Sequence, residues 1–476
     1  MAARYSKAMV AAMAAVAALA LGGCASVPAD RGWADVQQQV KSRGGPELPA
    51  ASGTAPEAVD AILRQGPLSA GDAVRVALLG NPRLRAEYAR LGLGAADVYQ
   101  AARPGNPVLS GAVLFSNTPG NADRYDFGIT QNFLDLLLLG PRKRLAQAEF
   151  ERTRQQAAGA ILDLSADVRA AYYRLVAAQQ VQRMRHVVAD AAAASARLAQ
   201  RYADAGNLPA LELELSQAEA VQAGFDAQQA GSQALAARAE LDRLLGLPAE
   251  RADWQVPDRL PVPLPGEDDA AGLQQLAQSS RLDLQAKQRE VDTLAQALGV
   301  TRDYRLAGDF EVGVQGERDT DRSHLLGPSA SLRLPLFDQG QAAVLRAQAR
   351  LEQGQAELAG LRLDVDQGVA LARERELAAG ALARSYAAEF IPLRERIVRH
   401  TQEKANFMLI GPFELIRARQ QEYEAYAGYL EAVRDYWLAR VELSRQVGAR
   451  LPSDSRISGD TVAPDVRAPA AAGGAP

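Results

Sequence analysis

The 476-residue sequence contains very few cysteine, histidine and aromatic residues. Its single cysteine excludes an intramolecular disulfide, and its three histidines lie too far apart in the sequence to indicate a histidine-clustered metal site. Only one apolar run, near residues 9–23, is long enough to be considered as a membrane helix, which excludes a polytopic helical membrane protein. The chain has 53 basic and 57 acidic residues, so it lacks the excess of basic charge that is typical of a nucleic-acid-binding protein. The composition by itself indicates a soluble helical protein.

The N-terminal residues 1–23 have the pattern of a bacterial lipoprotein signal peptide. A basic start precedes a short apolar core at residues 8–21, and two glycines follow before the single cysteine, Cys24. We expect cleavage before Cys24, with a covalent diacylglycerol on its sulfur and an N-acyl chain such as palmitate on its new amino group. Ala25 stands where an aspartate would favour inner-membrane retention, so it permits delivery to the outer membrane. The alternative is an ordinary signal peptide followed by a chance cysteine.

The body of the chain is a tandem duplication, with copies at residues 69–246 and 270–448. A proline-rich linker at 247–269 joins the copies. Residues 24–68 and 449–476 have biased composition and little periodicity, so we expect a lipid-anchored extended leader and a disordered tail. The matches between the copies are Leu84 with Leu284, Phe133 with Leu336, Gly206 with Gly411, Glu240 with Glu442, and Gly246 with Gly448.

Each copy is expected to contain a helix, a segment with strand character, a very long helix, a glycine turn and a return helix. The first helices are predicted at 70–102 and 271–305, with an interruption at Asn81-Pro82, and the return helices at 209–245 and 412–447. The long helices are predicted at 140–205 and 339–405, and about 66 residues at 1.5 Å each would extend roughly 100 Å. In the first of them, apolar residues from Leu164 to Ala178 advance in alternating steps of four and three, which is a coiled-coil seam. An ordinary antiparallel helical hairpin is the simpler alternative.

The strand segments, expected at 108–116, 125–133, 309–315 and 329–334, alternate between apolar and polar residues, and polar loops are expected at 118–124 and 317–326. Tyr125, Phe127 and Ile129 alternate with Asp126 and with glycine and threonine. Such alternation fits a soluble sheet on a core, or an outer-membrane barrel with lipid outside and water inside. The charged residues of the polar faces favour an aqueous lumen. The residues assigned to that lumen are Asp126, Thr130, Asp309, Glu311 and Arg333.

Four strands per chain require an oligomer. About eight strands are the minimum for a closed membrane barrel, and an open sheet edge in lipid would leave backbone groups unpaired. Two chains would give eight strands and a filled interior, whereas three would give twelve and a usable channel. Phe133 and Phe337 lie where strands pass into helices and would suit an interfacial aromatic girdle, with the basic run Arg142-Lys143-Arg144 beyond it. The alternative for that run is a solvated helix start.

Across residues 69–448 the motifs resemble those of the outer-membrane efflux protein (TolC) family, and the lipoprotein signal adds to the resemblance. The resemblance implies a mainly helical homotrimer, in which a trimeric α-barrel of long antiparallel helices continues into a 12-stranded β-barrel. It implies the exit duct of a tripartite efflux pump, joined by a periplasmic adaptor to an inner-membrane transporter of resistance–nodulation–division type. The motifs are Asn81-Pro82-Arg83-Leu84, Asn106-Pro107, Gln131-Asn132-Phe133, Gly140-Pro141-Arg142, Pro335-Leu336-Phe337-Asp338-Gln339-Gly340 and Asp435-Tyr436-Trp437-Leu438-Ala439-Arg440.

The resemblance also assigns the periplasmic ends. In this family two helix–turn–helix tips dock the adaptor and dilate, and here they map to Gly206, Asn207 and Pro209 and to Gly411 and Pro412. The glycines would supply positive φ and the prolines would suit a first helical turn. Glu414 is a candidate acidic gate, since a trimer would bring three carboxylates together. The alternative is a solvated glutamate at a helix start.

No catalytic, cofactor or metal-ligand motif emerges, so we expect a protein that is not an enzyme. The alternative function is a lipid-anchored periplasmic adaptor or coiled-coil scaffold, against which the duplicated strand pairs argue. The expected location is the outer membrane, with a large periplasmic part. The transported substrate, whether drug, metal cation or solvent, is not predicted.

Overall fold

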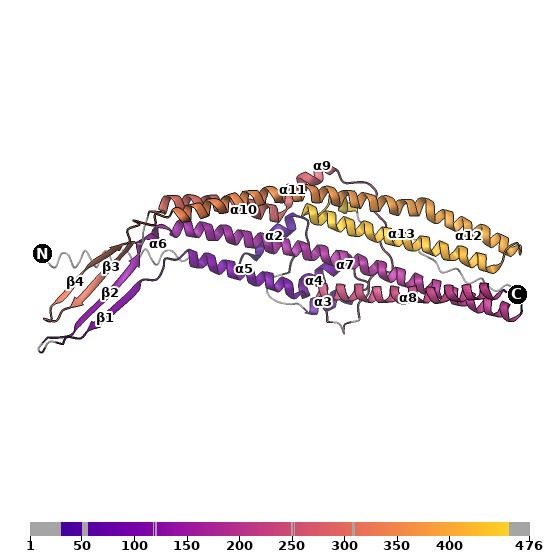
Figure 1. Cartoon of the computed structure of the whole chain (residues 1–476), viewed down its shortest axis with the longest axis horizontal. Helices are drawn as coiled ribbons and strands as arrows, with labels where there is room; N and C mark the ends of the chain where they lie inside the picture. The colour runs from indigo at the N-terminus through magenta and orange to yellow at the C-terminus, as the bar shows by residue number, and fades with distance from the viewer. Residues whose placement is uncertain are drawn as a thin grey trace. The chain divides into compact units, whose positions relative to one another are not determined.

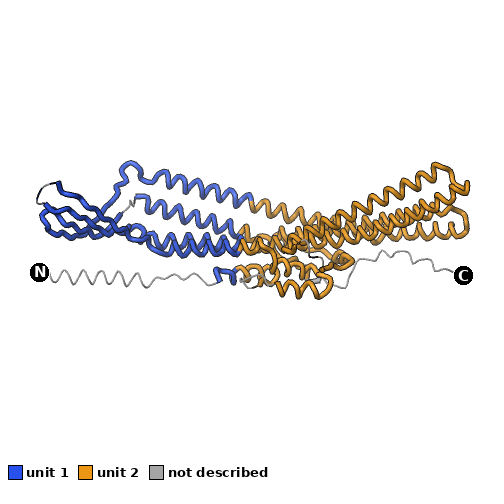
Figure 2. The backbone as a smooth tube through the Cα atoms, turned by 90° about the horizontal axis from the view of Figure 1, so that it is seen from below, with its two compact units in different colours: residues 1–35, 88–157, 285–360 blue, residues 36–87, 158–284, 361–476 orange. Residues whose placement is uncertain are grey.

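The computed structural model is mainly helical, with four strands among the described residues (Figure 1). The chain divides into two compact units, each assembled from several stretches of sequence (Figure 2). The first unit contains residues 1–35, 88–157 and 285–360, and the second contains 36–87, 158–284 and 361–476. No helix in the described part of the chain is long and apolar enough to span a membrane. The structure describes residues 30–49, 56–117, 119, 121–248, 251, 253–306 and 310–456.

The first unit contains one antiparallel sheet, in the order β1-β2-β3-β4. Strands β2 and β3 come from different copies of the repeat and pair directly. Gly313 permits this pairing, because a Cβ at that position would lie 2.4 Å from the carbonyl oxygen of Ile129. The strands are β1 (Val108–Leu114), β2 (Arg124–Asn132), β3 (Phe310–Arg318) and β4 (His324–Leu332).

The last two strands are longer than the alternation predicted. The expected strands 309–315 and 329–334 left 317–326 as a polar loop, whereas β3 and β4 extend into that loop and leave a turn at 319–323. The turn closes with a hydrogen bond from the Asp319 N–H to the Ser323 carbonyl oxygen at 3.0 Å, and Arg322 has φ +70°. A left-handed residue with a long side chain is an uncommon turn signal, so the pattern did not reveal this turn.

The helices that follow and precede the strands complete the first unit. The short helix α6 (Phe133–Leu137) leads from β2 into α7 (Leu139–Asp204), whose first part belongs to this unit. Parts of three other helices lie beside α7 in this unit (Figure 1). They belong to α5 (Pro82–Ala101), α10 (Leu282–Tyr304) and α11 (Gln341–Ser385).

The segment after the predicted lipidation site is folded rather than extended. Trp33 begins helix α2 (Trp33–Ser42), is 5% exposed and meets the ring of Tyr88 edge-on at 5.5 Å. Arg154 of α7 forms an ion pair with Asp35. A second short helix, α3 (Pro56–Leu63), buries Leu63. The prediction of an extended leader is therefore wrong for these segments, because tertiary contacts stabilise helices too short to show a clear pattern.

In the second unit, the same break recurs in both copies. Helices α4 (Ala70–Gly80) and α9 (Ala270–Ser280) end at Asn81 and Arg281, although only the first break was predicted. The Asn81 side chain donates to the carbonyl oxygen of Leu244 at 2.7 Å, and Arg281 donates to that of Gln446 at 2.9 Å. These acceptor carbonyl groups lie in the last turns of the return helices α8 (Ala210–Leu245) and α13 (Pro412–Val447). Both helices end at a glycine in the left-handed conformation. The internal repeat is thus present in three dimensions.

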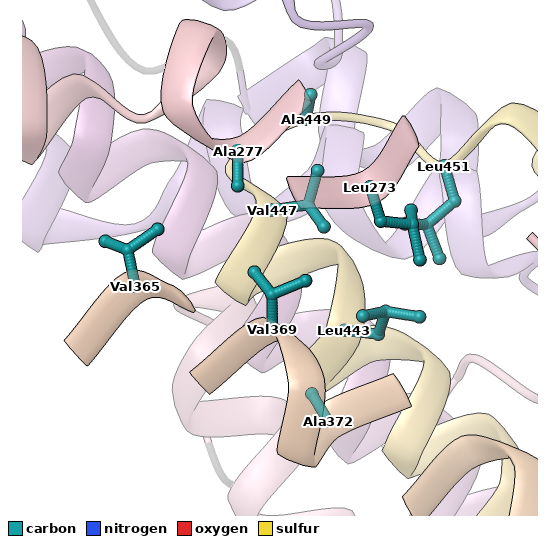
Figure 3. Close-up of a cluster of buried hydrophobic side chains, with 9 residues drawn as sticks. All are labelled: Leu273, Ala277, Val365, Val369, Ala372, Leu443, Val447, Ala449 and Leu451. Carbon is teal, nitrogen blue, oxygen red and sulfur yellow. The ribbon is translucent and has the colours of Figure 1, made fainter. Parts of the chain in front are cut away.

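A buried apolar cluster joins α9, α11 and α13 in the second unit (Figure 3). Ala449 and Leu451, which follow α13, belong to it, and the short 3₁₀ helix η2 (Pro452–Arg456) comes next. The predicted disordered tail is therefore wrong for residues 449–456, while 457–476 lie outside the described residues. The cluster contains Leu273, Ala277, Val365, Val369, Ala372, Leu443, Val447, Ala449 and Leu451.

The two long helices differ in regularity. Helix α7 runs for 66 residues without interruption, whereas the second stretch consists of α11, the π-helical turn η1 (Tyr386–Phe390) and α12 (Ile391–Asn406). In η1 the Ile391 N–H donates to the Tyr386 carbonyl oxygen, five residues back. Pro392 follows at once and has no N–H to continue the α-helical pattern. The predicted single helix 339–405 therefore contains a defect beside its proline.

Candidate channel wall and hairpin tips

One face of the sheet is apolar and exposed. On β2, the side chains of Tyr125, Phe127 and Ile129 are 43–57% exposed. The strand register places Leu109 and Val113 of β1 beside this row. Exposed Val312 and Val314 of β3 lie on its other side. An exposed apolar sheet face of this kind requires a partner or a lipid environment.

The opposite face of the sheet is polar and charged. Asp126 pairs in register with Glu317, and Asn132 pairs with Glu311. The Arg124 Nε lies 3.3 Å from an Asp126 carboxylate oxygen and 3.0 Å from one of Glu317. The sequence pattern placed both Arg124 and Glu317 in loops. The polar residues at 311 and 315 alternate with apolar ones, and continuing this alternation by two residues would have identified Glu317 as part of the strand.

Three of the five predicted lumen residues are brought together on this polar face. Asp126 and Thr130 lie four residues apart on the same face of β2, and Glu311 lies on the paired strand β3. Arg333 comes directly after the last residue of β4 and is exposed. Asp309 lies outside the described residues. The described residues thus form a continuous polar row with more carboxylates than guanidinium groups.

The sheet has two open edges in the part of the chain that is described. β1 pairs only with β2, and β4 pairs only with β3. Each edge strand therefore has a row of backbone N–H and C=O groups without a partner from another strand of this sheet. Such edges are incompatible with a lipid environment unless another chain pairs with them.

The junction between strands and helices carries an apolar belt. Phe133 contacts the ring of Phe310 edge-on at 5.9 Å, and Phe337 is 97% exposed. Leu136 and Leu137 of α6 are also exposed. Just beyond this belt, an Arg142 guanidinium nitrogen lies 2.7 Å from a carboxylate oxygen of Asp135. An interfacial aromatic girdle followed by basic residues stays a prediction for this junction.

The first hairpin tip has the predicted glycine geometry. Helix α7 ends at Asp204, and Gly206 takes a left-handed conformation with φ +74°. The Asn207 N–H donates to the Tyr202 carbonyl oxygen at 2.8 Å, which closes the helix end. Pro209 then caps the start of α8. Gly206, Asn207 and Pro209 therefore form one exposed turn.

The second tip uses a different residue at the equivalent place. Met408 has φ +58°, and the Leu409 N–H donates to the Lys404 carbonyl oxygen at 3.0 Å. Gly411 has φ −76° and ψ 161° and caps α13, whose first residue is Pro412. The predicted positive φ of Gly411 is therefore wrong, and so is its match with Gly206. Glycine is the usual residue in the left-handed conformation, so the sequence predicted that conformation for Gly411, whereas Met408 adopts it.

Apolar side chains cover the second tip. Phe407, Met408 and Leu409 are 77%, 92% and 72% exposed. Within the same unit, Tyr202 near the first tip contacts Phe413 near the second, with ring centroids 6.4 Å apart. Contiguous exposure of three large apolar residues is typical of a surface that contacts a partner.

Glu414 lies in the first turn of α13 and is exposed. Its backbone N–H donates to the Gly411 carbonyl oxygen at 3.3 Å. An acidic side chain in the first turn is favourable for the helix dipole, so this position has a structural role in any case. A gate formed by Glu414 stays a prediction.

A buried charged cluster in the second unit was not predicted. Arg440 of α13 is 4% exposed and donates to Glu376 of α11 at 2.6 Å and to Asp454 at 2.6 and 2.9 Å. It also donates to the Ser453 hydroxyl at 2.7 Å, while that hydroxyl donates to Asp268 of the linker at 2.5 Å. Although Arg440 belongs to a motif of the sequence analysis, its partners are 13 to 172 positions away in the sequence and had no local signal.

Burial changes the ionisation of this cluster. It raises the pKa of Glu376, which the neighbouring Arg440 only partly offsets. Burial opposes the charge on Arg440, but the carboxylates of Asp454 and Glu376 raise the pKa of its guanidinium overall. One guanidinium is therefore surrounded by three carboxylates with side-chain exposures of 10% or less. The cluster fastens the linker and the C-terminal segment to α11 and α13.

Duplicated long helices and an amphipathic four-stranded sheet make up a fold that is also found in outer-membrane channel proteins. The comparisons confirm the resemblance to the outer-membrane efflux protein family. They equally confirm the predicted mainly helical fold class. The matched proteins described by function are channel and resistance proteins rather than enzymes. No protein-family model matches the chain.

Individual relatives cover most of the chain. The sequence is 22% identical over 395 residues to the cobalt-zinc-cadmium resistance protein CzcC of Cupriavidus metallidurans, covering 80% of this chain and 90% of that protein. The fold matches a membrane protein from Pseudomonas aeruginosa with TM-score 0.66 and 18% identity, covering 82% and 93% of the two chains. It matches the Campylobacter jejuni outer-membrane channel CmeC with TM-score 0.65 and 15% identity, covering 87% and 91%. It matches the open state of the Neisseria gonorrhoeae channel MtrE with TM-score 0.64 and 16% identity, covering 79% and 88%.

Proposed function

We propose that this protein is the outer-membrane exit channel of a tripartite efflux pump and acts as a homotrimer. The observation that carries the proposal is the sheet, whose apolar face is exposed, whose other face is charged and whose two edge strands are open. Three copies would supply twelve strands, so that each β1 pairs with the β4 of a neighbour and no edge faces lipid. The apolar rows would then face lipid and the polar rows would face water.

The polar face supports a preference for cations. Its described charged residues on β2 and β3 are one guanidinium, Arg124, and three carboxylates, Asp126, Glu311 and Glu317. A trimer would repeat this excess of negative charge three times around one lumen, which attracts cations and repels anions. The relative CzcC is named as a cobalt-zinc-cadmium resistance protein, so we propose divalent metal cations as the cargo class.

The hairpin tips are the proposed docking surface for a periplasmic adaptor. The exposed apolar residues Phe407, Met408 and Leu409 give the second tip a hydrophobic contact surface, and the polar first tip lies within the same unit. The adaptor would connect the channel to an inner-membrane transporter of the resistance–nodulation–division type. Glu414, at the base of the second tip, is the proposed gate residue.

The proposed lipid anchor on Cys24 is within reach of the membrane surface. Gly32 lies against the ring of Phe150, since a Cβ on Gly32 would be 3.1 Å from it. From Phe150 back to Leu139, where α7 meets the apolar belt, the helix rises about 17 Å. The eight residue-to-residue steps from Gly32 back to Cys24 could extend at most about 28 Å, which exceeds that rise.

The function is tested with the full-length protein purified in detergent. We expect a trimer by light scattering and discrete single-channel currents when it is inserted into a planar bilayer. A detergent-independent monomer without conductance would overturn the channel proposal. It would favour the alternative, a lipid-anchored adaptor or scaffold.

The anchor is tested separately by Cys24→Ser with metabolic labelling by radioactive palmitate. The unchanged protein is expected to incorporate label, and Cys24→Ser is expected to lose it completely. A Ser26→Ala variant is the matched control, because it lies beside the acceptor and leaves the thiol in place. Label that persists in Cys24→Ser would contradict acylation of Cys24.

A further inference from the structure

An open hollow lies between the end of α5 and the first turns of α7 in the first unit. It measures about 820 Å³ and is lined by Arg103, Asn106, Arg142, Asp97 and Tyr99, among others. The loop that contributes Asn106 leads directly into β1, and α7 follows the apolar belt. The hollow therefore lies at the boundary between the sheet and the helices.

The hollow has a net positive surrounding. Arg103 places its guanidinium 3.8 Å from the centroid of the Tyr99 ring, and one nitrogen of Arg142 pairs with Asp135 at 2.7 Å. A guanidinium has five N–H donors, so these contacts leave each arginine able to bind an anion. Lys143 and Arg144 follow and are exposed, and the nearby acidic residues are Asp97 and Asp135. Of these four basic residues, Arg103 and Arg142 line the hollow, and Lys143 and Arg144 add positive charge to the adjoining surface of α7.

Apolar surface begins directly beside this basic hollow. Leu109, three positions after Asn106, is 75% exposed on the apolar face of β1. Leu136 and Leu137, which precede Arg142, are 44% and 51% exposed. A ligand with an anionic head and apolar chains would place its charge on the arginines and its chains against these residues.

We propose that this hollow binds the phosphate of an anionic phospholipid from the leaflet that faces the periplasm. The inference rests on the proposed function, since the sheet must lie in a membrane for a lipid to reach the site. Arg103 and Arg142 donate to the phosphate oxygens, Asn106 contacts the polar headgroup, and Lys143 and Arg144 attract the anionic surface. The bound lipid fixes the depth at which the sheet enters the membrane.

The test uses native mass spectrometry of the full-length protein in dodecyl maltoside. The probes are dihexanoyl-phosphatidylglycerol, which is anionic, dihexanoyl-phosphatidylcholine, which is zwitterionic, and inorganic phosphate. We expect phosphatidylglycerol to bind at least about tenfold more tightly than phosphatidylcholine, because charge-assisted hydrogen bonds are stronger when the ligand carries net charge. Inorganic phosphate at the same concentration is expected not to compete, since it has no chains for the apolar surface.

The variants separate a specific site from general attraction. Arg103→Ala combined with Arg142→Ala should lower the preference for phosphatidylglycerol about tenfold. Arg103→Lys combined with Arg142→Lys keeps both positive charges and should retain most of that preference. The matched control is Arg346→Ala with Arg350→Ala, which removes the same charge from exposed positions of α11 in the same unit. Single-channel conductance is recorded for every variant. Retained conductance shows that the variant folds and conducts. A loss of lipid preference in such a variant then concerns the lipid site alone and not the proposed channel function.

Any of four results would overturn the lipid site. One is an unchanged lipid preference in the alanine double variant, and another is an equal loss in the α11 control. The third is competition by inorganic phosphate, which would make the hollow a site for a free anion. If a neighbouring chain covers the hollow in the trimer, no preference is expected for any variant, and this result also rejects the proposal.

Discussion

The two copies of the repeat place an arginine at equivalent positions of their return helices, Arg238 in α8 and Arg440 in α13. Both fasten the segment that follows the helix, but by different chemistry. Arg238 stacks on Trp254, 4.1 Å from the ring centroid, and donates to its carbonyl oxygen at 3.2 Å. Arg440 is instead held in the buried carboxylate cluster.

The two copies therefore share an arginine that holds the segment after the return helix, but the residues that this arginine contacts differ between the copies. The Arg238 side chain is 24% exposed and that of Arg440 is 5% exposed. A partly solvated stacked arginine contributes modestly, whereas the loss of a buried guanidinium leaves buried carboxylates without their counter-charge. The second copy should therefore depend far more strongly on its arginine than the first copy does.

The largest expected effect comes from Arg440→Ala. Removing the guanidinium leaves Asp268, Glu376 and Asp454 buried around an empty position, and breaking such a buried pair costs about 3–5 kcal/mol. We expect a markedly lower melting temperature of the trimer, measured by differential scanning fluorimetry. Arg434→Ala, which removes a partly exposed arginine from the same helix, is the control and should cost less than about 1 kcal/mol. Equal melting temperatures for both variants would refute the role of the cluster.

Arg238→Ala should have a smaller effect. It removes the contact with Trp254 and one hydrogen bond, which together contribute about 1–2 kcal/mol. Its melting temperature should lie between those of the unchanged protein and Arg440→Ala, and Arg243→Ala on the same helix serves as the control. If Arg238→Ala destabilises the protein as much as Arg440→Ala does, the contrast between the copies is wrong.

The two tips differ in the residue that adopts the left-handed conformation, which is Gly206 in the first and Met408 in the second. A side chain in this conformation usually costs about 1 kcal/mol of stability. Gly206→Ala should weaken the end of α7, because Gly206 has φ +74°. Met408→Gly should strengthen the end of α12, because a glycine adopts φ +58° without strain. Amide hydrogen exchange of the last turn of each helix measures both. Gly411→Ala is the control and should change neither, since Gly411 has an ordinary φ.

The smallest expected effect concerns pH. Because burial raises the pKa of Glu376, the folded state binds its proton more tightly than the unfolded state does. Its contribution to stability is therefore complete below the ordinary carboxyl pKa and decreases as pH rises through the raised value. Glu376→Gln should remove this component when melting temperatures are compared from pH 4 to 8, and exposed Glu374→Gln should not. Parallel profiles for the unchanged protein and Glu376→Gln would exclude the effect.

Most helices could be predicted because their ends carry local signals. Pro412 and Gly448 bound α13 where the sequence placed it, since proline suits a first turn and glycine adopts the left-handed cap. The two faces of the strands followed from their alternation. The break at Arg281 had no such signal, because Arg281 is held by a contact with the end of α13 rather than by a proline.

The missed parts depend on contacts distant in the sequence. Helix α2 is too short for a clear pattern and is stabilised where Trp33 packs on Tyr88. The Arg440 cluster gathers residues from the linker, α11, α13 and the C-terminal segment. The left-handed Met408 contradicts the preference for glycine on which the tip assignment relied.

The central claim, that the polar face of the sheet lines an aqueous lumen, is tested by ion selectivity. The reversal potential of the trimer in a planar bilayer with a salt gradient should show a preference for cations. Glu311→Gln combined with Glu317→Gln should abolish that preference while open channels persist, and Glu352→Gln on α11 should leave it unchanged. An absence of channels, or a cation preference that survives the double variant, would contradict the account.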